Sequence, residues 1–119
     1  MYDHIGLQVK DLDASVRFYT GALAALGHEL CSRDDSGASF GPAGMLALWL
    51  TPVGDGPRSA THVAIRAHDR TAVESFYADG LRSGGRDNGR PELLADYGPT
   101  YYAAFLFDPD GNNVEAVYT

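Results

Sequence analysis

The fold is decided by a repeated stretch: HIGLQVKDLDASVRFYTGALAALG at residues 4–27 returns as HVAIRAHDRTAVESFYADGLRSGG at residues 62–85. The two stretches align without a gap at an offset of 58 residues. The identical pairs are His4/His62, Asp11/Asp69, Ala14/Ala72, Phe18/Phe76, Tyr19/Tyr77, Leu23/Leu81 and Gly27/Gly85. Each half has fewer than 60 residues and could hardly bury a core alone, so the halves must pack together or against another copy of the chain.

Both stretches change from an alternating pattern to a helical one. Residues 4–9 and 62–67 alternate between two faces, which predicts that a strand opens each half. Apolar residues then recur every three or four positions, which predicts one helix ending near Gly27 and a second from about Thr71 to Leu81. Asp11 or Asp13 can cap the first helix.

The remaining segments complete the order βαβββ in each half, so the predicted fold class is α+β. Further strands are expected at 28–33, 38–41, 45–51, 101–107 and 112–118, with Asp110-Gly111 as the turn between the last two. Residues 86–100 are rich in Gly, Pro and Asp, which predicts mostly loop. The chain is therefore interpreted as one domain, 1–119, made of repeats 1–53 and 59–119 joined by 54–58.

The composition of the chain narrows the kinds of binding partner and of cellular location that are expected. Nine Lys and Arg against sixteen Asp and Glu give a net charge of −7, which argues against nucleic acid and against an anionic membrane surface. No apolar stretch approaches the ~20 residues of a membrane span. One cysteine, Cys31, cannot form an internal disulfide, and the N-terminus lacks a signal-peptide pattern. A reduced, cytoplasmic location and a small-molecule partner are expected.

Strand periodicity places the chemically active side chains on one face. Because a helix must cover the apolar face of each sheet, His4 and His62 are expected on the opposite, concave face. The same alternation puts Trp49 there, and Glu115 is assigned to that face because a carboxylate is costly beneath a helix. The alternation along their strands also places Gln8 and Arg66 on the concave face. Apolar walls with a few converging polar groups predict a small-molecule pocket.

Two imidazoles and a carboxylate suit a divalent transition metal with open coordination positions. A lone histidine on a sheet is more often a hydrogen-bonded structural residue, but the equivalence of His4 and His62 in the repeat favours metal binding, with Glu115 as third ligand. His28 and His68 lack such partners and are interpreted as surface residues, and Cys31 as a packing residue. Residues 108–119 resemble a calcium loop only at their start, so the hairpin interpretation is preferred.

At this point the chain resembles the vicinal oxygen chelate superfamily, which includes glyoxalase I, extradiol dioxygenases, and fosfomycin and bleomycin resistance proteins. The resemblance rests on His4, Asp11-Leu12, Phe18-Tyr19, Gly27, His62, and Asp108-Pro109-Asp110-Gly111 followed by Glu115. It implies paired βαβββ modules whose sheets form a curved, open sheet or barrel around a divalent ion of Fe, Mn, Ni or Zn. It also implies a homodimer in which His4 comes from one subunit and His62 and Glu115 from the other.

Three departures from the family pattern bear on activity. Trp49 stands where glyoxalase I carries a fourth ligand, a Glu that a tryptophan cannot replace. Phe105 stands where dioxygenases and fosfomycin transferases usually carry a Tyr, and Gly6 where the transferases carry a Thr. Tyr101 lies on the same strand face as Phe105 and either supplies the hydroxyl or packs against Trp49.

The expected function is a metal-dependent enzyme acting on a small oxygen-rich substrate, of lyase, isomerase or dioxygenase type. Glu115 and Tyr101 are the candidate catalytic residues. Candidate substrate contacts are Gln8, Trp49, Arg66, Tyr101 and Phe105. The alternatives are a non-catalytic, drug-binding protein of the resistance type with Trp49 as its platform, and a paralogue with a vestigial site.

Overall fold

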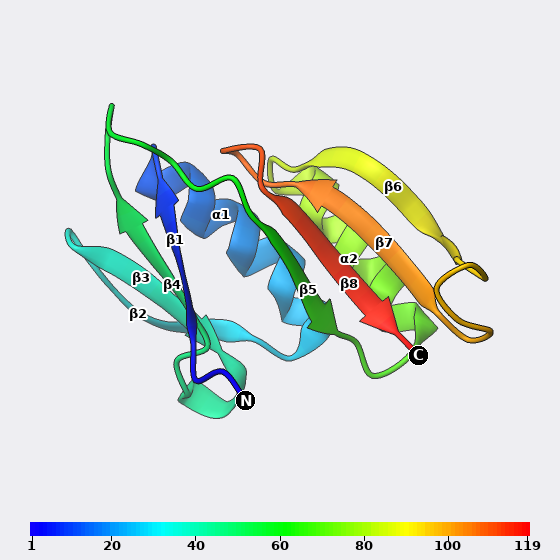
Figure 1. Ribbon diagram of the computed structural model, residues 1–119. Helices are drawn as coiled ribbons and strands as arrows, with labels where there is room; N and C mark the ends of the chain where they lie inside the picture. Colours follow the sequence, from blue (N-terminus) through cyan, green and yellow to red (C-terminus); the bar gives the residue numbers. More distant parts are fainter.

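The computed structural model describes all 119 residues as two consecutive βαβββ modules, as the repeat predicts (Figure 1). The first module comprises β1 (Ile5–Val9), α1 (Leu12–Leu23), β2 (Glu29–Asp34), β3 (Gly37–Gly41) and β4 (Leu48–Pro52). The second comprises β5 (His62–Arg66), α2 (Arg70–Arg82), β6 (Arg86–Leu93), β7 (Tyr102–Phe107) and β8 (Asn113–Tyr118). Two short 3₁₀ turns, Ala24–Leu26 and Pro42–Gly44, lie in the first module.

The modules form two four-stranded sheets with the same topology. The strand orders are β1-β4-β3-β2 and β5-β8-β7-β6, and in each sheet the first pair is parallel while the others are antiparallel. Both helices lie on the same side of the two sheets, behind them in Figure 1. The sheets are not hydrogen-bonded to each other and do not close into a barrel. The predicted α+β fold of tandem modules is confirmed in its open form.

Equivalent aspartates begin the two helices. Asp11 is the N-cap of α1 and accepts a hydrogen bond from the Ala14 amide, and Asp69 accepts from the Ala72 amide at the start of α2. The cap positions differ by 58 residues, which is the offset of the sequence repeat. Neither helix has the length and apolar character needed to cross a membrane.

A single apolar core lies between the helices and the covered faces of both sheets. It contains buried residues from both modules, among them Leu7, Phe18, Leu50, Phe76 and Leu106. Close packing requires a glycine at position 80 on α2. A Cβ atom there would lie 2.3 Å from Leu106 Cδ1 and 3.3 Å from Ala22 Cβ, so a larger residue would force the buried Leu106 side chain to move. Because both modules contribute to this core, neither buries its apolar face alone.

The prediction of mostly loop for residues 86–100 is wrong for its first half, because Arg86–Leu93 is strand β6. This strand pairs with β7 along its length, with irregular register around Gly89. It lies at the sheet edge, where a proline such as Pro91 is tolerated. Pairing with β7 therefore overrides local propensity. A smaller correction concerns the strand predicted at 45–51, which begins only at Leu48 because a 3₁₀ turn precedes it.

The turn between β7 and β8 is organised by Asp108, whose side chain is fully buried. One carboxylate oxygen, Oδ1, accepts from the backbone amides of Asp110 and Asn112 at 2.9 and 2.8 Å. The other, Oδ2, accepts from Asn112 Nδ2 at 2.8 Å and from the Tyr19 hydroxyl at 2.6 Å. Since Tyr19 belongs to α1, this carboxylate joins the two modules.

Two neighbours of Asp108 make further contacts, one with each module. Asp110 accepts from the Lys10 amide at 3.0 Å, just after β1. Asn112 Oδ1 accepts from the Thr61 amide at 2.9 Å, just before β5. The turn is therefore attached to the end of β1, to α1 and to the start of β5, and this fixes the second sheet relative to the first helix.

The buried joint predicts a specific loss of stability. Tyr19→Phe removes one hydrogen bond to a buried carboxylate and should lower the free energy of unfolding by about 2 kcal/mol. Burial, together with Asp108, raises the pKa of Tyr19 well above 10, so the loss should be constant between about pH 6 and 9. Urea unfolding measures it, with Tyr2→Phe as control because Tyr2 is exposed. Equal stability of the two variants would contradict the proposed joint.

Candidate functional site

The uncovered faces of the two sheets carry the predicted site residues. In the first sheet Gly6 pairs with Trp49, and in the second Ala64 pairs with Glu115. Side chains alternate along a strand, so Trp49 shares a face with His4, and Glu115 shares the equivalent face with His62. Gly6 and Ala64 are equivalent in the repeat, so Trp49 occupies in the first module the place that Glu115 occupies in the second.

Three predicted site residues form one hydrogen-bonded cluster on the second sheet. Glu115 is 2% exposed, yet both of its carboxylate oxygens have partners. His62 Nε2 lies 2.8 Å from Oε1, and the Tyr101 hydroxyl donates to Oε2 at 2.5 Å. The His62 side chain is about half exposed, at 54%, so the imidazole remains accessible from solvent. The cluster is thus a buried carboxylate with an accessible imidazole.

Aromatic rings surround this cluster. The Phe105 ring centroid lies 6.4 Å from that of His62, and Tyr97 packs edge-to-face on Tyr101 at 5.4 Å. The hydrogen bond to Glu115, followed by desolvation, raises the pKa of Tyr101 to about 12. The hydroxyl is therefore protonated at neutral pH and acts as a donor toward the carboxylate.

A cavity of about 600 Å³ opens over the cluster and is lined by His62, Asp96, Tyr97, Tyr101, Phe105 and Glu115. Asp96 and Tyr97 are two lining residues that the sequence analysis missed. They belong to the connection between β6 and β7, which has eight residues, whereas the equivalent connection between β2 and β3 has two. The one sequence signal for these two residues is the greater length of the β6–β7 connection, which becomes visible when the two halves of the repeat are aligned as far as β7.

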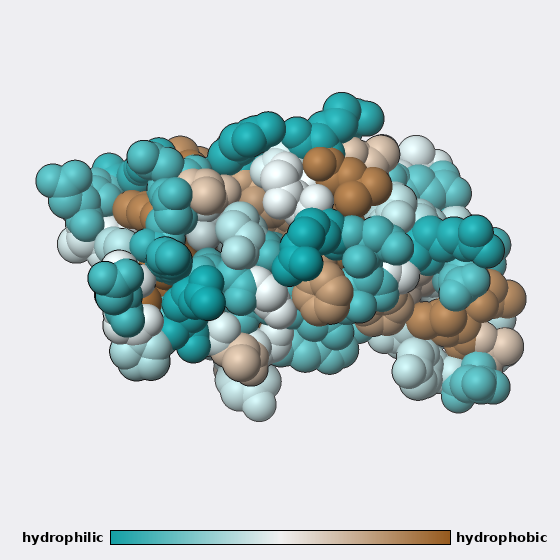
Figure 2. Space-filling view, turned by 90° about the horizontal axis from the view of Figure 1, so that it is seen from above, coloured by the Kyte–Doolittle hydropathy of each residue, from teal (hydrophilic) through white to brown (hydrophobic).

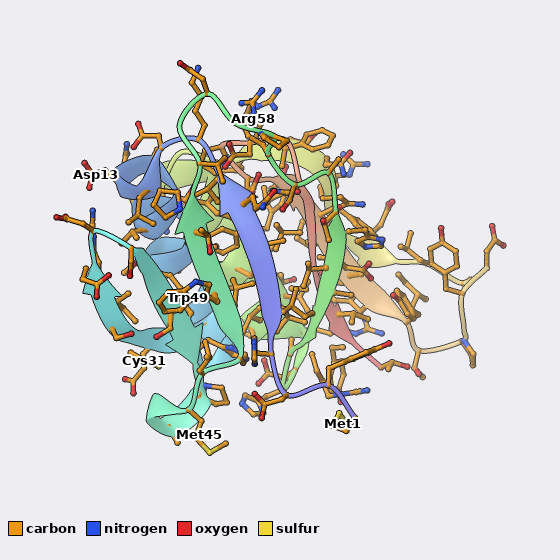
Figure 3. The ribbon with its side chains drawn as sticks, turned by 60° about the vertical axis from the view of Figure 1, so that its left-hand side comes forward. Met1, Asp13, Cys31, Met45, Trp49 and Arg58 are labelled. Carbon is orange, nitrogen blue, oxygen red and sulfur yellow. The ribbon has the colours of Figure 1, made fainter.

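The other predicted contacts lie away from this cavity in the single chain. His4 lies on the first sheet, half exposed and hydrogen-bonded to Asp3 at 2.7 Å. Gln8 is exposed on the same strand. Trp49 is half-buried on β4, where Figure 3 labels it, and its ring packs so near Gly37 that a Cβ there would lie 2.6 Å away.

Arg66 lies at the far end of β5 from His62. It lines a separate groove of about 280 Å³ between the two sheets, together with Ile5, His28 and Val63. His28 is partly exposed, but its Nδ1 atom is buried without a hydrogen-bond partner in the protein. Burial lowers the pKa of His28, so the neutral ring is favoured in this groove.

The cluster of one chain offers two side chains of types that can bind a metal. His62 offers an imidazole nitrogen and Glu115 a carboxylate oxygen, and both are ligand types that Fe, Mn, Ni and Zn accept. In a single chain no three His, Cys, Asp or Glu side chains gather closely enough to hold an ion. The donor chemistry therefore fits a divalent metal, and an ion held by three protein ligands would need the third from outside the second sheet.

The comparisons with known proteins agree on the kind of fold. The family model of the Glyoxalase/Bleomycin resistance protein/Dioxygenase superfamily matches residues 2–116. A search of curated proteins found no match to this sequence.

Among solved structures, a glyoxalase/bleomycin resistance protein from Albidiferax ferrireducens is 25% identical, with a TM-score of 0.84 over 100% of this chain and 98% of that one. A glyoxalase I mutant from Zea mays is 28% identical, with a TM-score of 0.70 over 96% of this chain and 44% of that one. A lactoylglutathione lyase from Agrobacterium tumefaciens, at 20% identity, has a TM-score of 0.68 over 98% and 92%. The last of these shows similarity of fold alone.

The cluster makes a prediction about the Tyr101 proton. Glu115→Gln removes the negative charge that holds this proton, so the pKa of Tyr101 should fall from about 12 toward the ordinary value near 10. Proteins labelled with ¹³C at the tyrosine Cζ carbon allow the titration to be followed by NMR, with Tyr101→Phe to assign the resonance. Tyr102, whose hydroxyl contacts Glu74, is the internal reference. An unchanged Tyr101 titration would show that the contact with Glu115 is absent in solution.

Proposed function

The chain belongs to the glyoxalase/bleomycin resistance protein/dioxygenase superfamily, and on that premise we propose that it is a metal-dependent enzyme whose site is completed by a second copy of the chain. The observation that carries this proposal is the His62–Glu115 pair at 2.8 Å on the wall of an open cavity. A buried carboxylate beside an accessible imidazole is half of a metal site, and the proposed third ligand is His4 of the partner subunit.

Symmetry explains why a pair of chains is required. Each chain has one uncovered face with His4 and one with His62 and Glu115, and these faces belong to different sheets. A two-fold dimer that brings the first sheet of one copy onto the second sheet of the other would form the site twice. Gln8 of the partner subunit and Trp49 of the partner subunit would then close the cavity opposite Phe105.

Each protein group has a defined task in this proposal. A divalent ion of Fe, Mn, Ni or Zn would supply Lewis acidity toward two neighbouring oxygens of the substrate. Glu115 and His62 hold one side of that position. The rings of Tyr97 and Phe105 enclose the apolar part of the substrate and reduce the access of water. Proton removal, addition and ring opening can all begin from a substrate held in this way.

The cavity wall indicates the substrate class. Three aromatic rings line it, together with the carboxylates of Asp96 and Glu115, and no Lys or Arg takes part. The net charge of the chain, −7, has the same sign. A neutral substrate with a ring and two adjacent oxygens therefore suits the cavity, whereas an anionic substituent would face like charge.

A second candidate function is non-catalytic binding of an aromatic compound. It is favoured by the fact that His62 and Glu115 satisfy each other without an ion and that the wall is largely aromatic. The two candidates differ in their need for metal. An enzyme of the proposed kind requires an ion for ligand binding, and a binder does not.

Mixing two inactive variants tests the shared site. His4→Ala and His62→Ala should each lose tight binding of Mn or Zn. When equal amounts are refolded together, half of the dimers contain one chain of each kind and carry one intact site, so about a quarter of the wild-type metal should return. The measurements are metal per chain by plasma mass spectrometry and mass by sedimentation, with His68→Ala as the control because His68 is exposed and outside the cavity.

Two results would contradict the proposal. Wild-type protein that retains no metal after reconstitution, but still binds an aromatic ligand, would support the non-catalytic binder. Metal binding by the wild type with no recovery in the mixture would show that the site is not shared between subunits.

A further inference from the structure

The two oxygens of Glu115 have different hydrogen-bond partners. Oε1 lies 2.8 Å from the Nε2 atom of His62, which lines the cavity. Oε2 accepts the Tyr101 hydroxyl proton at 2.5 Å. The carboxylate itself is 2% exposed, so water does not replace either partner.

The backbone around Tyr101 holds its ring in this place. Its carbonyl accepts from the Leu94 amide at 2.8 Å, and its amide donates to the Gly98 carbonyl at 3.3 Å. These bonds close the eight-residue connection between β6 and β7 into a compact turn. The Tyr97 ring, carried by the same turn, packs against the ring of Tyr101 edge-to-face. The hydroxyl is thus presented to Glu115 by a preorganised segment.

We propose that Tyr101 is a positioning residue that engages Oε2 of Glu115 and leaves Oε1 as the only carboxylate oxygen available to a metal ion. This inference rests on the proposed function. A free carboxylate can bind an ion through one or two oxygens, and a hydrogen bond to one of them selects the one-oxygen mode. The hydroxyl also provides a hydrogen-bond donor to a buried carboxylate, which would otherwise lack a partner at Oε2.

This role differs from a direct contact with the substrate. A tyrosine hydroxyl has one proton to donate, and the structure directs that proton to Oε2. Phe105, next to it on the wall, has no proton to donate. The cavity therefore holds the carboxylate in place through Tyr101 and contacts the ligand mainly through ring surfaces.

The chain contains a matched control for this proposal. Tyr102 is the next residue, and its hydroxyl also donates to a carboxylate, Glu74 Oε2, at 2.8 Å. Its side chain packs against the core on the helix-covered face, away from the cavity. Tyr101→Phe and Tyr102→Phe therefore each remove one tyrosine–carboxylate hydrogen bond, from opposite faces of one strand.

Cobalt binding separates the two variants. Titration of metal-free dimer with Co²⁺, followed by calorimetry and visible absorption, should show Tyr101→Phe binding about 10 to 100-fold more weakly than wild type. Its absorption bands should also change, because Glu115 is then free to bind through two oxygens. Tyr102→Phe should match the wild type in both affinity and spectrum. Equal behaviour of Tyr101→Phe and the wild type would overturn the positioning role.

A metal-free measurement separates this proposal from the proposed function. In protein labelled with ¹³C at the Glu carboxyl carbons, the Glu115 resonance, assigned with Glu115→Gln, should shift in Tyr101→Phe and stay in place in Tyr102→Phe. Wild-type protein that fails to bind cobalt would refute the metal-dependent function, even if this shift is observed. An absent shift would refute the role of Tyr101, even if the wild type binds cobalt.

Discussion

One buried carboxylate holds the two modules in register. Asp108 accepts four hydrogen bonds, three of them from its own turn and one from Tyr19 on the helix of the other module. A carboxylate without these donors would be too costly to bury, so the turn, α1 and the linker must be assembled together. The turn also determines where β8 begins. Glu115 lies three residues beyond Asn112, so the candidate site depends on the same joint.

The two modules share the same helix caps and strand order, but their uncovered faces carry different side chains. Asp11 and Asp69 cap both helices in the same way, and both sheets have the same strand order. At equivalent positions, however, the first sheet has Trp49 and the second has Glu115. The longer connection between β6 and β7 then adds a wall to the second sheet alone. The uncovered face of the first module thus has a histidine but no carboxylate. The uncovered face of the second module has a histidine and a carboxylate but no second histidine.

Periodicity predicted the fold and the faces of the sheets well, because both depend on local alternation of side chains. It assigned His62 to the uncovered face, the cost of burying a carboxylate assigned Glu115 there, and the register of β5 and β8 puts both on one face. It failed for β6, since Gly89 and Pro91 disfavour a strand locally and only pairing with β7 stabilises one. Asp108 was interpreted as a turn residue, because its contact with Tyr19 spans 89 positions in the sequence. The sequence did not identify Asp96 and Tyr97 as cavity residues for a similar reason. Their turn is closed by hydrogen bonds that the local sequence does not reveal.

The acidity of the chain has opposite consequences for an ion and for a substrate. A net charge of −7 would attract a divalent cation toward a cavity that already contains Asp96 and Glu115. The same charge repels an anionic ligand until a cation offsets it. If the proposed site holds such an ion, two imidazoles and one carboxylate would leave it with a net positive charge, which would attract the oxygen atoms of a neutral substrate. The aromatic rings are uncharged, so they would contribute affinity for the apolar part of the substrate. The charges around the cavity would then determine which substrate charge is accepted.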